Sequence, residues 1–324
     1  YTGEARIGAT VYIDSPTKRG DRITLDAITS GDRSGYVFAQ YDAPVGGSGL
    51  RLGASLDHLR YRLGEEFRND GLEGNATEAR LFASYPVIRA SQYNLYTRVQ
   101  AGSLDLRDRN DATGRSDRRV HQLTVGVAGD METRIVKPGE LMFGIDLSGG
   151  QLDILGGTAF QDFDNQFQQA EGGFARLGYG VSYLQHLAGR LSAFFSVTGQ
   201  FASQNLDTSQ KFFIGGPYDV AGYPISEASG DEGMLVHTDL RYDLPEGFLN
   251  SDTQLSVFYA HGRAQIYKDT WAGWQGTNTR IRNTIELASV GLSSHSMWRD
   301  KYVLQLMVGR QLGQNLASDP VTLE

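Results

Sequence analysis

The chain has 324 residues, among them 40 Gly, 16 Tyr and 15 Phe but only 8 Pro, and this length suits either two soluble domains or one large barrel. It contains no Cys, which excludes disulfides and thiol chemistry. The formal net charge of -8 argues against a wide nucleic-acid-binding face, so we expect no nucleic acid among the partners.

Hydrophobic residues make up 40% of the chain, but no run of about eighteen apolar residues occurs, which excludes a transmembrane helix. A transmembrane β-barrel is compatible with this composition, since only every second residue of its strands faces lipid. Because the chain opens at Tyr1 without a basic and apolar leader, we expect a mature or trimmed product whose export signal lies outside it.

Alternation with a period of two recurs along nearly the whole chain. The first such segment covers residues 6–13, another covers 140–148, and a late one covers 302–309. One face of each is apolar, whereas the other carries groups that a dry core would not accept, such as Thr10 and Asp146. The segments run about nine to eleven residues or more, the span of a tilted transmembrane strand. The pattern predicts an all-β fold, an antiparallel transmembrane barrel of about fourteen strands in one domain, without helical periodicity.

Two kinds of connection separate the segments. Short links are expected at about 15–21, 46–49, 88–92 and 186–190. They interleave with mostly long and polar links at about 31–34, 63–75, 107–117, 150–172 and 203–232. Short turns at one rim and longer loops at the other are typical of outer-membrane barrels.

Three places in the sequence carry a family resemblance. The first is the opening hairpin, with Thr2, Gly3, Arg6, Asp14, Ser15, Pro16, Gly20 and Asp21. The second is segment 212–243, which reads Phe-Phe-Ile-Gly-Gly-Pro-Tyr-Asp-Val-Ala-Gly-Tyr, then Ser-Gly-Asp-Glu-Gly, then Thr-Asp-Leu-Arg-Tyr-Asp. The third is Phe-Tyr-Ala-His-Gly at 258–262. Together they resemble the hemolysin-activator type of two-partner secretion transporter, within the wider outer-membrane assembly-factor superfamily.

That resemblance implies a sixteen-stranded barrel in the bacterial outer membrane, which follows periplasmic polypeptide-transport-associated domains and exports one large partner exoprotein without nucleotide. We expect about fourteen of these strands in the chain, with the first family strand preceding Tyr1, the last following Leu312, and the periplasmic domains outside it. The expected partners are therefore a secreted exoprotein, outer-membrane lipid and the periplasmic domains of the same protein.

The resemblance also implies a loop at about 203–233 that is inserted in the barrel lumen. Its motif residues are Gly215, Gly216, Tyr218, Val220, Ala221, Gly222, Tyr223, Gly230, Asp231 and Gly233. The lumen-facing strand residues expected to meet it are Asp239, Arg241, Phe258, Ala260 and Gly262. In the same alternation, Leu255, Val257 and Tyr259 are expected to face lipid.

The chain departs from the family at both halves of one ion pair. Ala221 stands where the family has an Arg in the loop, and Ala260 stands where it has the Asp that pairs with that Arg. Loss of one partner would leave a charge unpaired at a cost of roughly 3 to 5 kcal/mol, whereas loss of both can be nearly neutral. Our hypothesis is that Tyr218, Tyr223 and Phe258 hold the loop by packing and leave it more mobile than in relatives.

Other chemistry finds little support. His58, His121, His186, His237, His261 and His295 lack metal-ligand spacing, and no Ser, His and acid constellation occurs in a nucleophile-elbow context. Asp162, Asp164 and Asn165 fit no complete calcium motif, so a plain polar loop is the favoured reading. We expect no catalytic residue, no metal, no cofactor and no enzymatic activity.

The leading function is translocation of a specific secreted exoprotein through an outer-membrane pore that the loop gates. The alternative is an outer-membrane protein insertase that acts through the seam between its first and last strands. A third candidate, a passive diffusion porin, is disfavoured because it would have no need of segment 212–243.

Overall fold

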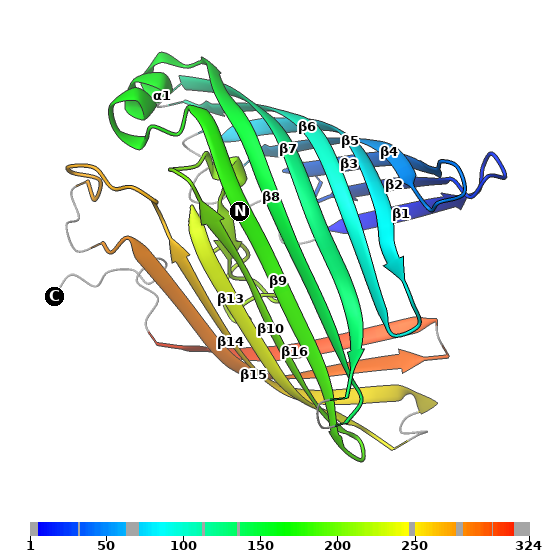
Figure 1. Cartoon of the computed structure of the whole chain (residues 1–324). Coiled ribbons are helices and arrows are strands. Elements are labelled where there is room, and N and C mark those ends of the chain that lie inside the picture. The colour runs from blue at the N-terminus through cyan, green and yellow to red at the C-terminus, as the bar shows by residue number, and fades with distance from the viewer. Residues whose placement is uncertain are drawn as a thin grey trace. The chain divides into compact units, whose positions relative to one another are not determined.

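The computed structural model describes residues 6–31, 33–62, 71–111, 114–134, 137–245, 250–276, 281–299 and 301–313. Nearly all of its regular structure is β-strand (Figure 1). The long strands are β1 (Ile7–Asp14), β2 (Arg22–Thr29), β3 (Ser34–Pro44), β4 (Arg51–Arg62), β5 (Glu73–Arg89), β6 (Tyr93–Asn110), β7 (Gly114–Thr133), β8 (Gly139–Gly156), β9 (Gly172–Ala188), β10 (Leu191–Ala202), β13 (Glu232–Asp243), β14 (Asp252–Gln265), β15 (Thr284–Trp298) and β16 (Tyr302–Leu312).

These strands form one 14-stranded antiparallel sheet in chain order, in which β10 is followed directly by β13. The register of each pair fixes which side chains are neighbours, for example His237 opposite Ala260 and Ala260 opposite Ser289. Strand count and fold class are thus as the alternation predicted. The two remaining strands, β11 (Phe212–Ile214) and β12 (Ala228–Gly230), make a separate hairpin between β10 and β13.

The chain divides into two compact units. The first takes Tyr1–Ile88, Tyr96–Val127 and Asp146–Ala175, and the second takes Arg89–Leu95, Ala128–Ile145 and Arg176–Glu324. The segment 203–231, which we call the loop, and the strands β13 to β16 all belong to the second unit.

Strand β14 shows how the alternation sorts side chains between two faces. Leu255, Val257 and Tyr259 are exposed, whereas Phe258 and Ala260 are only 2% and 0% exposed. The exposed apolar set lies where lipid contact was predicted. We call the opposite face of β13 to β16, which carries Phe258 and Ala260, the loop-bearing face.

The opening hairpin forms as expected, with the first link at 15–21 between β1 and β2. Asp21 is buried at its end and accepts hydrogen bonds from the backbone N–H and the hydroxyl of Thr17, at 3.2 and 2.8 Å. Thr2 and Gly3, which belong to the same motif, lie outside the described residues.

Two connections are shorter than expected. The link predicted at 150–172 begins only after β8 ends at Gly156. In place of a link at 107–117, β6 continues to Asn110 and β7 begins at Gly114. Asp105 of β6 pairs with Arg119 of β7 at 2.6 Å, and Asp108 pairs with Arg118. Because opposite charges face each other across the ladder, these polar residues continue the strands instead of ending them.

The structure contains short helices although the sequence shows no helical periodicity. The link between β8 and β9 contains α1 (Thr158–Phe163) and a π-helical turn, η2 (Asp164–Gln168), and a 3₁₀ turn, η3 (Thr208–Gln210), lies in the loop. Segments of six, five and three residues are too short to show a helical period in sequence. No helix among the described residues has the length and apolar character needed to cross a membrane.

Candidate functional site

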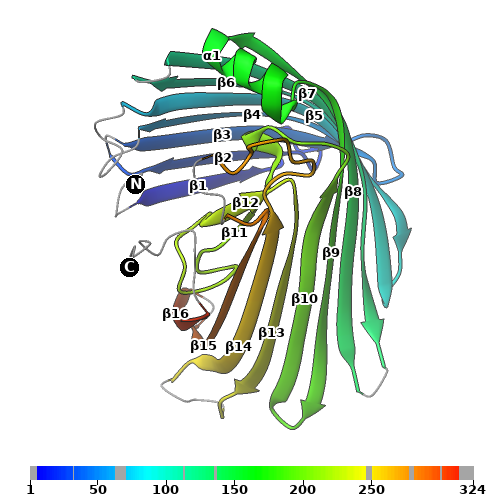
Figure 2. The same cartoon turned by 90° about the vertical axis from the view of Figure 1, so that its left-hand side faces the viewer.

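The loop is an ordered hairpin that returns onto the sheet. Its two short strands pair with Phe212 opposite Gly230 and Ile214 opposite Ala228. Figure 2 shows β11 and β12 beside the ends of β13 and β14. The turn between them begins at Gly215 and Gly216, with φ of 106° and 112°, a backbone conformation that favours glycine.

Apolar packing joins the loop to the loop-bearing face. Ile214, Val220, Tyr223 and Ala228 from the loop form one buried cluster with Ala260, Ala264 and Leu287 from β14 and β15. Gly262 lets Ile214 approach β14 closely, since a Cβ at that glycine would lie 3.2 Å from the Cβ of Ile214. A Cβ at Gly230 would lie even closer to the backbone of Gln265, so glycine is needed there too. Full burial of each large apolar side chain is worth about 1.5–3 kcal/mol, so the cluster holds the hairpin firmly.

The tip of the loop lies on β15 and β16. A Cβ at Gly309 of β16 would lie 2.8 Å from the Cβ of Ala221, so only glycine admits this contact. The side-chain amide of Gln311 donates to the carbonyl of Gly222 at 2.6 Å, and the Tyr223 hydroxyl donates to the carbonyl of Ala288 at 3.3 Å. Side chains of β16 therefore take part in holding the tip.

A buried ion pair closes the base of the loop. Lys211 Nζ lies 2.9 Å from Asp231, with side chains 7% and 0% exposed. Asp231 also accepts from the backbone N–H groups of Leu206 and Lys268, at 3.1 and 2.7 Å. Lys211 donates to the Ile266 carbonyl at 2.6 Å. Burial raises the pKa of Asp231, and the charge of Lys211 acts in the opposite direction.

The predicted strand residues of β13 form a second polar cluster. Asp239 binds His237 Nε2 at 2.6 Å through one oxygen and Arg241 at 2.7 Å through the other. The Arg241 guanidinium lies 4.2 Å from the ring centroid of Phe194. The His237 ring stacks on Phe258, with centroids 5.7 Å apart. Gly233, at the start of β13, borders Phe212 and the carbonyl of Arg263.

The structure places the two alanines of the lost ion pair on the same face but with different neighbours. The buried cluster that holds Ala260 includes Val220, whereas Ala221 lies over Gly309 of β16. Direct contact between positions 221 and 260 stays a prediction.

Tyr218 was wrongly expected to pack against the sheet. It is 81% exposed, because it sits in a turn in which the Asp219 N–H donates to the Gly216 carbonyl and the side chain projects away. Tyr223 and Phe258, by contrast, are 5% and 2% exposed.

Sequence reasoning missed Lys211 and the pair Gly309 and Gln311. Lys211 could have been noticed as a single cation between Gln210 and two Phe residues. No local pattern in the sequence indicates that residues of β16 contact the loop.

The acidic residues and histidines considered for metal binding do not come together in the described part of the structure. Among the described residues, no group of three or more His, Cys, Asp or Glu side chains is placed to hold a metal. Asp164, considered for calcium, accepts from the backbone N–H groups of Ala170 and Glu171, both at 2.9 Å.

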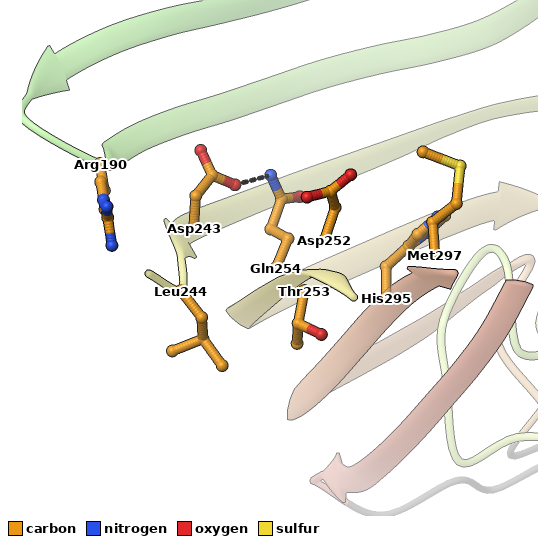
Figure 3. Close-up of a pocket in the computed structure, with 8 residues that line it drawn as sticks. All are labelled: Arg190, Asp243, Leu244, Asp252, Thr253, Gln254, His295 and Met297. Atoms are coloured by element: carbon orange, nitrogen blue, oxygen red, sulfur yellow. Dashed lines mark hydrogen bonds between the residues drawn. The ribbon is translucent and has the colours of Figure 1, made fainter. Parts of the chain in front are cut away.

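A groove with both polar and apolar lining residues lies at the opposite end of the same strands (Figure 3). It has a volume of about 510 Å³. The Gln254 amide donates to Asp243 across it at 2.8 Å. Its lining residues are Arg190, Asp243, Leu244, Asp252, Thr253, Gln254, His295 and Met297.

An antiparallel sheet in chain order that carries a folded-back hairpin on one face is the fold of outer-membrane β-barrels of the CdiB and BamA type. CdiB from Escherichia coli matches with a TM-score of 0.77 at 14% identity, over 96% of this chain and 56% of that chain. BamA from Haemophilus ducreyi lacking POTRA domains 1–3 matches with a TM-score of 0.69 at 14% identity, over 96% and 65%. At such identities the likeness shows the fold alone.

The family follows from the sequence. Residues 1–281 match the haemolysin secretion/activation protein ShlB/FhaC/HecB family. The chain belongs to this family, the two-partner secretion transporters of the hemolysin-activator type.

Curated relatives carry a transporter name. Heme/hemopexin transporter protein HuxB of Haemophilus influenzae (strain 86-028NP) is 28% identical over 318 residues, which are 98% of this chain and 55% of the relative. HuxB of strain ATCC 51907 / DSM 11121 / KW20 / Rd is 27% identical over the same shares. These relatives are named as transporters and not as enzymes, and the chain spans about half their length.

Proposed function

We propose that this chain is the pore-forming part of a transporter in the bacterial outer membrane, through which a specific secreted exoprotein passes without nucleotide. Periplasmic domains of the same protein would deliver the exoprotein, and lipid would surround the exposed apolar face. No enzymatic step belongs to this function.

The loop is the gate in this proposal. The observation that carries it is the placement of the hairpin on the face opposite the exposed apolar residues, where a pore lumen would be. Its attachments are all non-covalent and fall into two parts, a buried ion pair at the base and a packed tip. Such a segment can leave the face as a unit while the strands stay paired, because backbone ladder bonds hold the strands and side-chain contacts hold the loop.

A deletion tests the gate. Residues 216–227 would be replaced by a short Gly-Ser turn, which leaves β11, β12 and the Lys211–Asp231 pair in place. We expect the single-channel conductance in planar lipid bilayers to rise, since the deleted part covers the loop-bearing face. Tyr218→Ala, at an exposed position of the same turn, is the matched control and should leave conductance unchanged.

The insertase alternative makes the opposite prediction. A protein that works through its seam does not depend on a plugged lumen, so an unchanged conductance after the deletion would favour it over the pore. The proposed cargo is a secreted exoprotein and is not specified further, because heme and hemopexin appear only in the names of relatives that are 27–28% identical.

A further inference from the structure

Four neighbouring strands, β4 to β7, are aligned by contacts near one end (Figure 1). Tyr61 of β4 lies opposite Gly74 of β5. The Tyr61 hydroxyl donates to Asp108 of β6 at 2.6 Å, and Asp108 pairs with Arg118 of β7. A Cβ at Gly74 would collide with the carboxylate of Asp108, so only glycine lets this contact cross β5. These four residues therefore mark one level on four strands.

The opposite face of these strands combines exposed apolar residues with arginines. Side chains alternate along a strand, so the residues on either side of the four aligned ones point to this other face. It carries the exposed residues Leu56, Leu81, Val99 and Leu123. Towards the aligned end it carries six arginines, which we call the arginine row: Arg60, Arg62, Arg107, Arg109, Arg115 and Arg119. The arginine row is therefore continuous with the surface expected to face lipid.

Positive charge exceeds negative charge in the arginine row. Four of its members pair with acidic residues at 2.6–3.5 Å, namely Arg62 with Glu73, Arg109 with Asp111, Arg115 with Asp117 and Arg119 with Asp105. Arg60 and Arg107 are exposed, and their side chains form no hydrogen bond or ion pair with the residues that the structure describes. The whole chain has a formal charge of -8, so this local excess of positive charge is not a result of composition.

The length of the strands sets the height of the arginine row in a membrane. β5, β6 and β7 have 17, 18 and 20 residues, whereas about 9–11 residues of a tilted strand cross the hydrocarbon core. Their ends must therefore extend past the core. The arginine row lies at the end away from the short links at 90–92 and 134–138. Because short links face the periplasm in outer-membrane barrels, the arginine row lies at the outer leaflet.

We propose that the arginine row binds the phosphate groups of lipid A, the phosphorylated glycolipid of the outer leaflet, chiefly through Arg60 and Arg107. A guanidinium stays charged at neutral pH and can donate two parallel hydrogen bonds to one phosphate. Leu56 lies four residues from Arg60 on the same face, about 13 Å along the strand, so the acyl chains of the same lipid would contact the apolar residues. The inference rests on the proposed function, because it requires this end of the strands to face the outer leaflet.

The test is the binding of lipid A to the purified protein in detergent micelles, measured by native mass spectrometry. We expect the protein to bind lipid A with both phosphates about tenfold more tightly than lipid A from which the phosphates have been removed, the scale of two exposed ion pairs. Arg107→Gln should weaken binding of the phosphorylated form about threefold, and Arg60→Gln with Arg107→Gln about tenfold. Inorganic phosphate at constant ionic strength should not displace the lipid, because it lacks acyl chains.

Arg98→Gln is the matched control. Arg98 lies on β6 like Arg107 but on the other face, where it pairs with Asp146 at 3.3 Å, so its loss should leave lipid binding as it is. The proposal is overturned if both forms of lipid A bind equally, or if Arg98→Gln weakens binding as much as Arg107→Gln. It is also overturned if the double variant, shown to be folded by its heat-modifiable mobility, binds like the unchanged protein, or if inorganic phosphate displaces the lipid.

The pore and the lipid site can fail separately. Deletion of 216–227 tests the pore by its conductance in bilayers that contain no lipid A. Unchanged conductance there refutes the gate, whereas raised conductance together with equal binding of the two forms of lipid A refutes only the role of the arginine row.

Discussion

Tyr223 is the residue whose removal tests most sharply whether packing holds the loop. Its side chain is 5% exposed within the cluster of Val220, Ala260 and Leu287, and its hydroxyl donates to the carbonyl of Ala288. Tyr223→Ala removes the ring from this cluster and leaves a cavity between the loop and β15. The backbone ladders of β13 to β16 do not involve this side chain, so the sheet itself should stay folded.

The expected magnitude follows from the burial. Replacement of a buried aromatic residue by Ala costs about 3–5 kcal/mol in protein cores, and we take about 3 kcal/mol because a loop can collapse partly into the cavity. At 1.4 kcal/mol per factor of ten, the ratio of undocked to docked loop should rise about 100-fold. Tyr223→Phe loses only the hydrogen bond, about 1 kcal/mol, and should raise the ratio about fivefold.

Single-channel recording in planar bilayers measures this ratio as the open probability. Tyr218→Ala is the control, since it makes the same substitution at a side chain that is 81% exposed and should change nothing. The reasoning is refuted if Tyr223→Ala and Tyr218→Ala open the channel to the same extent, or if Tyr223→Phe has the larger effect of the two Tyr223 variants.

Two further predictions concern the base and the tip of the loop. Lys211→Met leaves Asp231 buried without its cation and should lower the folding stability by about 3–5 kcal/mol, measured by heat-modifiable mobility on gels. Lys268→Met, at a pair whose side chains are 35% and 18% exposed, should cost about 0–1 kcal/mol. Equal losses in the two variants would contradict the burial argument. Gly309→Val should displace the tip, since a Cβ there meets the backbone and Cβ of Ala221 at 2.8–2.9 Å, and should raise the open probability. Ala221→Gly should relieve part of that effect, and a channel that stays closed in Gly309→Val would show that the tip is not seated on β16.

Much of the fold can be predicted from local patterns in the sequence. The alternation through Val257, Phe258 and Ala260 assigned the two faces of β14 correctly, because the period of two is a property of each strand by itself. The link that the alternation predicted at about 203–232 agrees with the end of β10 at Ala202 and the start of β13 at Glu232 for the same reason.

The details of the site depended on contacts between distant parts of the chain. Tyr218 and Tyr223 lie in the same glycine-rich turn, and only the path of the backbone decides that one is exposed and the other buried. Ala221 lies on Gly309, 88 positions further along, so no local pattern could pair them. Lys211 and Asp231 lie on opposite arms of the hairpin and meet only once β11 and β12 have paired.

A reversible lock on the loop tests the central claim most directly. The chain has no Cys, so Ile214→Cys with Gly262→Cys introduces a single thiol pair between β11 and β14. A Cβ at position 262 would lie 3.2 Å from the Cβ of Ile214, close to the roughly 3.5–4.5 Å of disulfides. We predict that channel openings disappear when this disulfide has formed and return on reduction. Openings that continue unchanged while the disulfide is intact would contradict the account.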